Sequence, residues 1–211
     1  MEYFDKSNYD IKQIDYKIAM DLVVKNHYLH RRCPHHIAFG CIDKSNGDCV
    51  AVIVYGKPAS NSLCKGICGE DESNNVIELS RLWVHDSIKK NMASYLIGNT
   101  LKLLDKEIIV SYADTSQNHI GKVYQATNWV YTGLSDKHCQ WVILGEKTTH
   151  ERHWADKYGG VKKAKEILGD KLIKTERPRK HRYIYFNCDK RRKKDLIKKL
   201  RYPIYNYPKG E

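Results

Sequence analysis

NHIGKVYQATNWVYTG, residues 118–133, holds the helix, turn and strand on which the expected fold depends. It follows EIIVSYAD (107–114), a run with β-branched residues that predicts a strand. The stretch itself divides into a short helix with Tyr124, a turn at Asn128 and an aromatic strand that ends near Gly133. Asparagine tolerates the left-handed conformation that such a turn needs. We therefore expect strand, helix and strand in succession, with one tyrosine on the helix.

The rest of the first half shows the periodicities of further helices and strands. Ile11, Ile14, Ile18 and Leu22 recur at helical spacing, which predicts an amphipathic helix ending near His27. HIAFGCID and CVAVIVYG, joined through Asn-Gly, predict an antiparallel hairpin. The remaining expectations are a loop over 57–73, a strand over 75–84 and a helix over 89–104.

This order of elements resembles the fold of the GCN5-related N-acetyltransferases (GNAT). In that fold two central parallel strands splay apart, and an acyl-CoA lies in the opening with its pyrophosphate at a helix N-terminus. The resemblance implies an α/β, GNAT-like acyltransferase fold with a mixed, partly splayed central sheet and a basic C-terminal extension. It also implies cofactor contacts at Ser94 and Asn118, and a role for Tyr124 as hydrogen-bond donor or general acid. Packing in the core is the alternative for Tyr124.

The positive charge is confined to the last third of the chain. The 211 residues carry a net charge of +12, and residues 146–211 contain 21 Lys and Arg against 9 Asp and Glu, whereas residues 1–145 contain 16 of each. We therefore expect a GNAT-like catalytic core over 1–145 and a basic nucleic-acid-binding extension, packed on the core, over 146–211. Candidate phosphate contacts are Arg177, Arg179, Lys180, Arg182, Arg191 and Arg192. The alternative is a solvated basic surface.

Composition places further limits on the protein. No apolar run approaches the length of a membrane span, and the first residues are polar and acidic. Seven scattered cysteines, an odd number, favour reduced thiols over a disulfide framework. We expect a cytoplasmic protein with no membrane partner, and the sequence leaves the oligomeric state open.

HYLHRRCPHH brings His27, His30, His35 and His36 within ten residues. Imidazole combined with a carboxylate suits a transition metal, and Asp114, at the end of a predicted strand, is the best candidate for that carboxylate. From spacing alone, a basic loop with surface histidines is the favoured alternative.

Several motifs in this order resemble the phage Mom DNA-modification family: NHYLHRR, ELSRLWV, SYAD and the opening stretch, with KHRYIYF and YPK in the tail. The resemblance runs from about residue 20 to the C-terminus. It implies a GNAT-like enzyme that converts DNA adenine to N6-carbamoylmethyladenine and protects phage DNA from host restriction. The implied cofactors are acetyl-CoA or a related acyl donor, and iron. The implied partner is DNA, with the adenine flipped out or single-stranded.

By position in the Mom resemblance, His27, Tyr28 and Asp114 are the candidate metal or catalytic set, and Tyr124 and Arg81 would lie near the CoA-derived group. Strand alternation puts Arg81 on one face with Ile77, Leu79 and Trp83. A salt bridge at the strand end and a ligand contact in the cleft remain open for Arg81.

Two other functions fit the sequence less well. One is a conventional GNAT acetyltransferase acting on RNA, aminoacyl-tRNA or protein. The other is a non-catalytic nucleic-acid-binding protein on the same scaffold.

Overall fold

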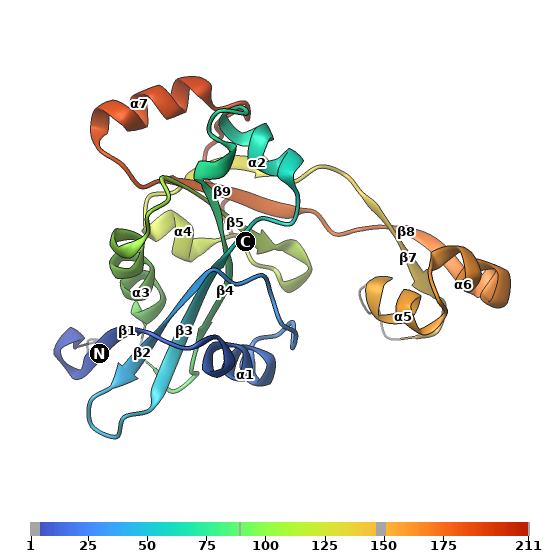
Figure 1. Ribbon diagram of the computed structural model, residues 1–211, viewed down its shortest axis with the longest axis horizontal. Coiled ribbons are helices and arrows are strands. Elements are labelled where there is room, and N and C mark those ends of the chain that lie inside the picture. The colour runs from blue at the N-terminus through green and yellow to red at the C-terminus, as the bar shows by residue number, and fades with distance from the viewer. Residues whose placement is uncertain (1–4, 89, 147–150, 211) are drawn as a thin grey trace.

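The structure, a computed structural model, describes residues 5–88, 90–146 and 151–210. Within them a seven-stranded mixed sheet has the order β1-β2-β3-β4-β5-β9-β6, and β7 and β8 form a separate pair (Figure 1). The strands are β1 (Tyr9–Gln13), β2 (Ile37–Asp43), β3 (Cys49–Gly56), β4 (Val76–Val84), β5 (Ile108–Asp114), β6 (Val130–Leu134), β7 (Cys139–Ile143), β8 (Leu172–Glu176) and β9 (Lys180–Phe186). The helices are α1 (Tyr16–Asn26), α2 (Asn61–Cys68), α3 (Met92–Thr100), α4 (Lys122–Ala126), α5 (Glu151–Lys157), α6 (Val161–Leu168) and α7 (Lys190–Lys199).

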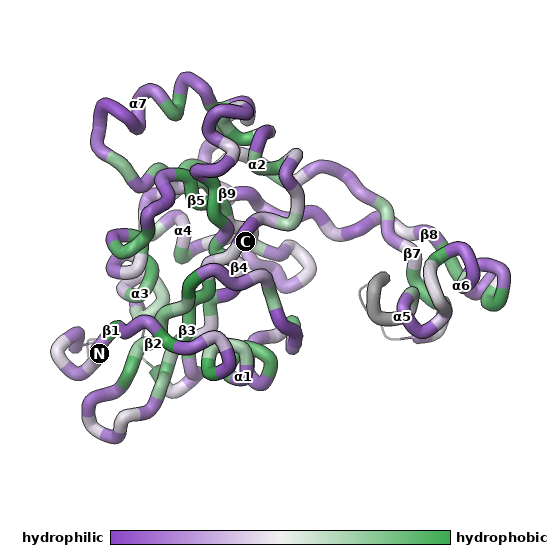
Figure 2. Tube along the Cα trace, viewed as in Figure 1, coloured by the Kyte–Doolittle hydropathy of each residue, from purple (hydrophilic) through white to green (hydrophobic). Residues whose placement is uncertain are grey.

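Helices cover both faces of the central sheet. On one face α3 and α4 pack through Met92, Leu96, Ile97 and Tyr124. On the other face, α1 packs over β2 and β3, while α2 and α7 pack over the middle of the sheet. The tube in Figure 2 is mostly green along the central strands and mostly purple along α7. The fold is therefore a three-layer α/β arrangement with its apolar core on both sides of the sheet.

The two central parallel strands separate after a short paired segment. β4 and β5 pair only from Val76 with Ile108 to Glu78 with Val110, and the pairing then ends. Beyond that point the Ser111 hydroxyl donates to the Leu79 carbonyl oxygen across the gap (2.9 Å). The expected mixed, partly splayed sheet is confirmed, and the chain has a GNAT-like α/β fold.

A β-bulge in β4 corrects the face that strand alternation assigned to Arg81. Tyr55 of β3 pairs with Leu79 and Val54 pairs with Arg81, so Ser80 is an extra residue between them. The bulge reverses the alternation. Trp83 therefore packs with the α1 cluster, whereas Ile77 and Leu79 belong to the α3–α4 core.

The helix expected from Ile11 is wrong at its start. Residues 9–13 form β1, in which Ile11 pairs with Cys41 of β2. Helix α1 begins only at Tyr16, because the Asp15 side chain accepts from the Lys17 N–H and caps the first turn. Residues 9–13 pair with the edge strand of the hairpin, and this pairing outweighs the helical spacing of the isoleucines.

The loop expected over 57–73 contains α2. Ser60 caps this helix by accepting from the Leu63 N–H, and Cys64, Ile67 and Cys68 form its buried face. Cysteine acts here as a small apolar residue, so the buried face of α2 was not recognised in the sequence. The hairpin and the strands expected over 75–84 and 107–114 are confirmed, and so is the left-handed turn at Asn128 (φ 60°).

Residues of β7, α5, α6 and β8 form a lobe that projects from the central sheet in Figure 1. The lobe has its own small core of Ile143, Trp154, Ala164 and Leu172. The position at which the charge changes, residue 145, lies inside this lobe, between β7 and α5. The following strand, β9, belongs to the central sheet between β5 and β6.

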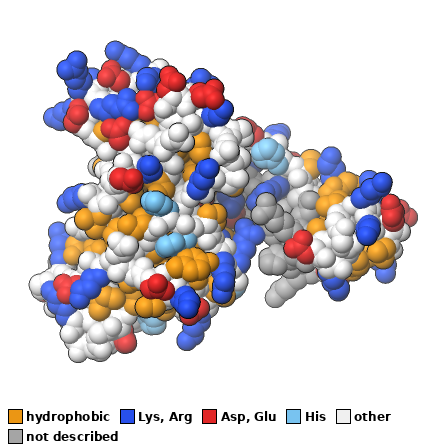
Figure 3. Space-filling view, viewed as in Figure 1, with side chains coloured by type: hydrophobic (Ala, Val, Ile, Leu, Met, Phe, Trp, Pro, Cys, Tyr) orange, Lys and Arg blue, Asp and Glu red, His pale blue; other side chains and the backbone are white. Residues whose placement is uncertain are grey.

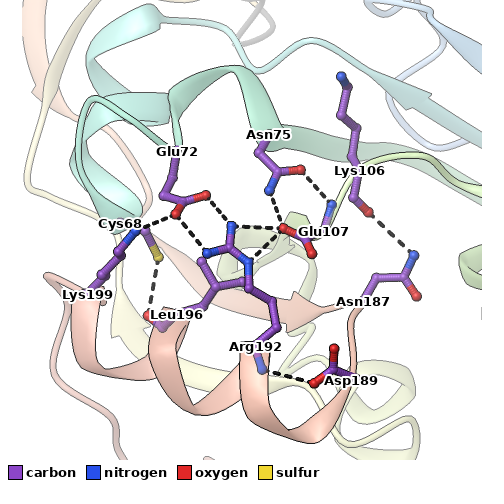
Figure 4. Close-up of polar contacts among 10 residues, drawn as sticks. All are labelled: Cys68, Glu72, Asn75, Lys106, Glu107, Asn187, Asp189, Arg192, Leu196 and Lys199. Atoms are coloured by element: carbon purple, nitrogen blue, oxygen red, sulfur yellow. Dashed lines mark hydrogen bonds and ion pairs between the residues drawn. The ribbon is translucent and has the colours of Figure 1, made fainter.

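Helix α7 is fixed to the body by a charge network that we call the α7 clasp: Glu72, Glu107, Arg192 and Lys199 (Figure 4). Arg192 donates to both carboxyl oxygens of Glu72 (3.0 and 2.6 Å) and from Nε to Glu107 (3.0 Å), and Lys199 also donates to Glu72 (2.6 Å). Hydrogen bonds from Arg192 and Lys199 hold the pKa of buried Glu72 at about 2. The clasp therefore joins the C-terminal helix to the segments that precede β4 and β5.

No described helix is long and apolar enough to cross a membrane.

Candidate functional site

A cavity of about 520 Å³ lies where β4 and β5 separate. It receives side chains from both faces of the sheet, because the gap between the strands joins the two sides. Figure 3 shows His side chains beside hydrophobic ones in the middle of the face that bears α1 and α7. The lining residues are His27, Tyr28, Leu29, Glu78, Leu79, Ser80, Arg81, Leu82, Tyr112, Ala113, Asn118, His119, Ile120, Gly121, Lys122, Val123, Tyr124 and Lys180.

Tyr124 both packs in the core and lines the cavity. Its ring lies against Trp129 and Tyr183, with centroids 5.1 and 5.2 Å away, and Trp129 is fully buried. Its hydroxyl is 2.8 Å from the Ser111 hydroxyl, and burial raises the pKa of Tyr124 to about 12. Ser111 can donate its one proton either to the Leu79 carbonyl or to the Tyr124 hydroxyl, and in the second case the phenol proton is free for a group in the cavity. The phenol is thus protonated and held in a fixed orientation.

Glu78 is a cavity residue that the sequence analysis missed. It is the last residue of β4 paired with β5, and burial raises the pKa of its carboxyl to about 7, although Arg81 and Lys180 act in the opposite direction. An acidic side chain in a central strand was a visible signal in ELSRLWV. A carboxyl with a pKa near 7 is suited to exchange protons at neutral pH.

Arg81 points its guanidinium into the same region. Its Nη1 donates to the Ser80 carbonyl (2.6 Å), whereas its buried Nε has no hydrogen-bond partner among the described residues. Arg81 makes no described salt bridge, so the strand-end ion pair considered from the sequence is absent from the described part of the chain. The guanidinium retains donor capacity toward the cavity.

His27 and Tyr28 follow the last turn of α1 and line the cavity. The Leu29 N–H donates to His27 Nδ1 (3.2 Å), so the neutral imidazole carries its proton on Nε2. Burial, with Arg81 and His119 nearby, lowers the pKa of His27 to about 4, and burial raises the pKa of Tyr28. At neutral pH both rings are therefore uncharged.

Asp114 lies beside the cavity and is engaged on both oxygens. Oδ1 accepts from the Ser116 N–H and hydroxyl, and Oδ2 pairs with Lys180 (3.2 Å). Burial would raise the pKa of Asp114, but the hydrogen bonds and the ion pair outweigh it and lower the pKa. A metal ion at this carboxylate would have to displace Lys180.

The described residues contain no group of three or more His, Cys, Asp or Glu side chains arranged to hold a metal ion. The set expected from the sequence has only His27 and Asp114 of these types, with the phenol of Tyr28 as its third member. In this arrangement the donors do not form a prepared iron site, and the iron set stays a prediction.

The two expected cofactor contacts lie apart. Asn118 lines the cavity in a left-handed conformation (φ 54°). Ser94 lies on the first turn of α3, where its hydroxyl donates to the Asn91 carbonyl (2.9 Å), and it does not line the cavity. Asn91 itself is left-handed (φ 82°), so it supplies the turn into α3 for which glycine is the usual residue.

The six expected phosphate contacts have different surroundings. Arg182 is buried, with Nε donating to Thr132 (3.0 Å) and the guanidinium 3.4 Å from the centroid of the Tyr202 ring, and Arg192 belongs to the α7 clasp. Both make these contacts inside the protein, which leaves them less available to nucleic acid, and their assignment to it stays a prediction. Arg179 donates to the Leu134 carbonyl (3.2 Å). Arg177 and Arg191 are exposed.

Comparisons with known proteins agree with this geometry. The model of the Mom protein family matches residues 8–209. The chain is 26% identical over 205 residues to the methylcarbamoylase mom of Escherichia phage Mu, covering 94% of this chain and 83% of that protein.

Solved structures similar to the chain include an N-acetyltransferase from Staphylococcus aureus Mu50, with 13% identity, a TM-score of 0.49 and coverage of 86% of this chain and 99% of that one. Another is yncA, a putative acetyltransferase from Salmonella typhimurium with its cofactor acetyl-CoA, with 10% identity, a TM-score of 0.49 and coverage of 86% and 95%. The assignment of the fold rests on the strand topology described above. Because the family model spans nearly the whole sequence, the chain belongs to the Mom protein family.

Proposed function

We propose that this protein attaches a carbamoylmethyl group to N6 of adenine in DNA and so protects phage DNA from host restriction. The observation that carries the proposal is the cavity at the β4–β5 separation in a member of the Mom family. This cavity combines a carboxyl able to exchange protons, a protonated phenol and a guanidinium with spare donor capacity. These are the groups that a transfer reaction to a weak amine nucleophile needs.

The acceptor must leave the base stack to reach this cavity. Adenine N6 is a poor nucleophile because its lone pair is delocalised into the ring, and in a duplex it lies inside the helix. A cavity of about 520 Å³ is in the size range of small-ligand sites, and it can accept an extruded or single-stranded base.

Glu78 is the proposed proton acceptor for N6. With a pKa of about 7 its carboxyl is partly ionised at neutral pH. As N6 forms its new bond to the methylene carbon of the donor, it loses a proton, and Glu78 can take that proton. The leaving group of the donor departs with the bonding electron pair.

Tyr124 is the proposed hydrogen-bond donor to the group being transferred. Its phenol stays protonated at neutral pH and its direction is set by Ser111. An acyl donor related to acetyl-CoA, with a leaving group on its α-carbon, is proposed to bind beside Tyr124 and Asn118 and would supply the carbon unit, whereas the methyl group of acetyl-CoA itself carries no leaving group for this displacement. Arg81 can stabilise negative charge on a carbonyl oxygen there. The role of iron stays a prediction, and none of these steps uses it.

The DNA backbone needs cations outside the cavity. Of the six phosphate contacts expected from the sequence, Arg177 and Arg191 are exposed, and we propose these two. Arg179 and Lys180 lie close to the end of β9 that is nearest the cavity. Such contacts give affinity without sequence specificity.

Mass spectrometry of nucleosides tests the proposal. DNA from cells that express the protein is expected to contain carbamoylmethyl-deoxyadenosine. Tyr124→Phe and Asp114→Asn are expected to lose this product while the purified variants still bind DNA, because the first removes the phenol hydroxyl and the second removes the negative charge that pairs with Lys180 beside the cavity. Tyr205→Phe and Asp86→Asn are matched controls, since Tyr205 and Asp86 are exposed and lie away from the lining residues.

Unmodified DNA from cells with soluble wild-type protein would contradict the proposal. Acetylated RNA or protein in the same cells would then indicate an ordinary acetyltransferase. Full product from both variants would remove Tyr124 and Asp114 from the mechanism.

A further inference from the structure

The Tyr28 ring lies at the mouth of the cavity and packs on the buried His27 ring. The Tyr28 side chain is 39% exposed, although it lines the cavity. Its ring stacks on the His27 imidazole, with centroids 4.4 Å apart and planes 29° from parallel, and His27 is only 9% exposed. A buried ring therefore supports a half-exposed one.

The backbone around this pair is also fixed. His27 ends α1, and its N–H donates to the Val23 carbonyl. The His30 N–H donates to the His27 carbonyl (2.7 Å) in a tight turn with His30 in the left-handed region (φ 43°). The His30 ring nitrogen lies 3.0 Å from the Val24 carbonyl oxygen, and the Leu29 N–H orients the His27 ring. These contacts hold Tyr28 at the cavity mouth without using its own hydroxyl.

The third aromatic side chain at the mouth comes from the opposite side of the gap. His119 follows β5, on the loop before α4, and is exposed. Its ring meets the Tyr28 ring edge to face, with centroids 5.7 Å apart and planes at 84°. His27, Tyr28 and His119 therefore form a continuous group of aromatic rings at the cavity.

We propose that Tyr28 is the stacking platform for the extruded base, which lies with its flat face on the phenol ring while His27 supports that ring from behind. This inference rests on the proposed function for the identity of the base as adenine. A base face on an aromatic ring is a common mode of binding for unstacked nucleotides, and it compensates for part of the stacking lost on extrusion.

The proposal gives Tyr28 a role that depends on its ring, whereas the metal or catalytic role expected from the sequence depends on its hydroxyl. Tyr28→Phe keeps the ring and removes the hydroxyl, and Tyr28→Ala removes both. The two substitutions therefore separate the two roles. Because Tyr28 is partly exposed and its hydroxyl is not needed to hold the turn, both variants are expected to fold.

The probe is single-stranded DNA in which 2-aminopurine, a fluorescent adenine analogue, replaces every adenine. Stacking on an aromatic ring quenches its fluorescence. We expect wild type and Tyr28→Phe to quench it equally at saturation, and Tyr28→Ala to quench it less and to bind on the order of ten-fold more weakly. Tyr205→Ala is the control, because it removes an exposed ring outside the cavity and should match wild type.

Two results would overturn the stacking role: Tyr28→Phe behaving like Tyr28→Ala, or all variants quenching alike. The nucleoside measurement separates this inference from the proposed function. Modified adenine with quenching that does not depend on Tyr28 would refute only the platform. Unmodified adenine with quenching that does depend on Tyr28 would refute only the chemistry.

Discussion

The cavity and the α7 clasp each contain a largely buried glutamate near two cations, yet the two carboxyls behave oppositely. In the clasp, Glu72 is in direct contact with Arg192 and Lys199, and its pKa is about 2. In the cavity, Arg81 and Lys180 act on Glu78 without a described hydrogen bond to it, and its pKa is about 7. Direct hydrogen bonds outweigh the cost of burial in the first case, and burial prevails in the second.

The difference separates structural charges from charges that remain available to a ligand. A carboxyl satisfied by two cations fixes α7 and cannot exchange protons near neutral pH. A carboxyl that is buried and has no direct partner destabilises the fold slightly and can act on a bound molecule. Substitutions and changes of pH can test this division.

The largest effect is expected from Glu78→Gln on product formation. The amide cannot accept the N6 proton, so the rate of adenine modification should fall by at least about 100-fold. The rate is measured by mass spectrometry of nucleosides over time with purified protein. In wild type it should rise with pH through about 7, as Glu78 ionises, and then level off. The control is Glu166→Gln, because Glu166 is exposed. If Glu78→Gln modifies adenine at the wild-type rate, Glu78 is not the proton acceptor.

Arg192→Met should cause the largest loss of stability. It leaves Glu107 without its cation and Glu72 with Lys199 alone, and we expect the free energy of unfolding to fall by about 2 kcal/mol at pH 7. Denaturant unfolding measures this free energy. The control is Arg191→Met, one residue away but exposed, which should change the free energy of unfolding by less than about 0.5 kcal/mol. Equal effects of the two changes would mean that the clasp does not hold α7.

The clasp should also give the protein a stability that depends on acid. The pKa of Glu72 is lowered in the folded state, so its contribution is present above the ordinary value of 4.5 and is lost as the pH falls toward 2. Unfolding measured between pH 7 and pH 3 should show this loss in wild type. Glu72→Gln should be less stable at pH 7 and should show a smaller loss.

Glu78 should act on stability with the opposite sign. Its folded pKa is raised, so stability is fully present below 4.5 and is lost as the pH rises through about 7. Above pH 7, Glu78→Gln should therefore be more stable than wild type, by about 1 to 2 kcal/mol. Denaturant unfolding of both proteins at pH 5 and pH 8 checks this difference in stability. If Glu78→Gln is less stable than wild type at pH 8, the ionised Glu78 carboxylate has a stabilising partner in the folded protein.

The smallest effect is expected on the outer side of α7. Lys190, Arg191 and Lys194 are basic and lie away from the clasp contacts. Changing all three to Gln should leave stability nearly unchanged, and the salt dependence of DNA affinity should shrink by about one unit of slope for each phosphate that the variant no longer neutralises. An unchanged slope would remove this surface from DNA binding.

Much of the fold was readable from the sequence because local signals agreed with tertiary ones. The Asn-Gly pair predicted the hairpin, and residues 118–133 predicted the helix that carries Tyr124. Ile11 was misassigned because strand pairing overrode its helical spacing, and α2 was missed because its buried face is built from cysteines.

The candidate site was predictable only in part. His27, Tyr28, Asn118 and Tyr124 line one cavity, and the roles expected for them stay predictions. The raised pKa of Glu78 could not be predicted without knowing the burial of its carboxyl. One bulge at Ser80 reversed the face of every later residue in β4. Arg182 and Arg192 read as surface cations because sequence does not show which acids and rings surround them.

The position of β9 has a consequence for the order in which the chain can fold. β6 pairs with β9, and β9 is made after the whole projecting lobe. During synthesis β5 and β6 therefore emerge as open edges, with unpaired backbone groups, until the last segment of the chain is available. Tyr124 lies on the helix between those edges, so the cavity is completed late. A nascent or truncated chain that lacks β9 should be prone to aggregation and inactive.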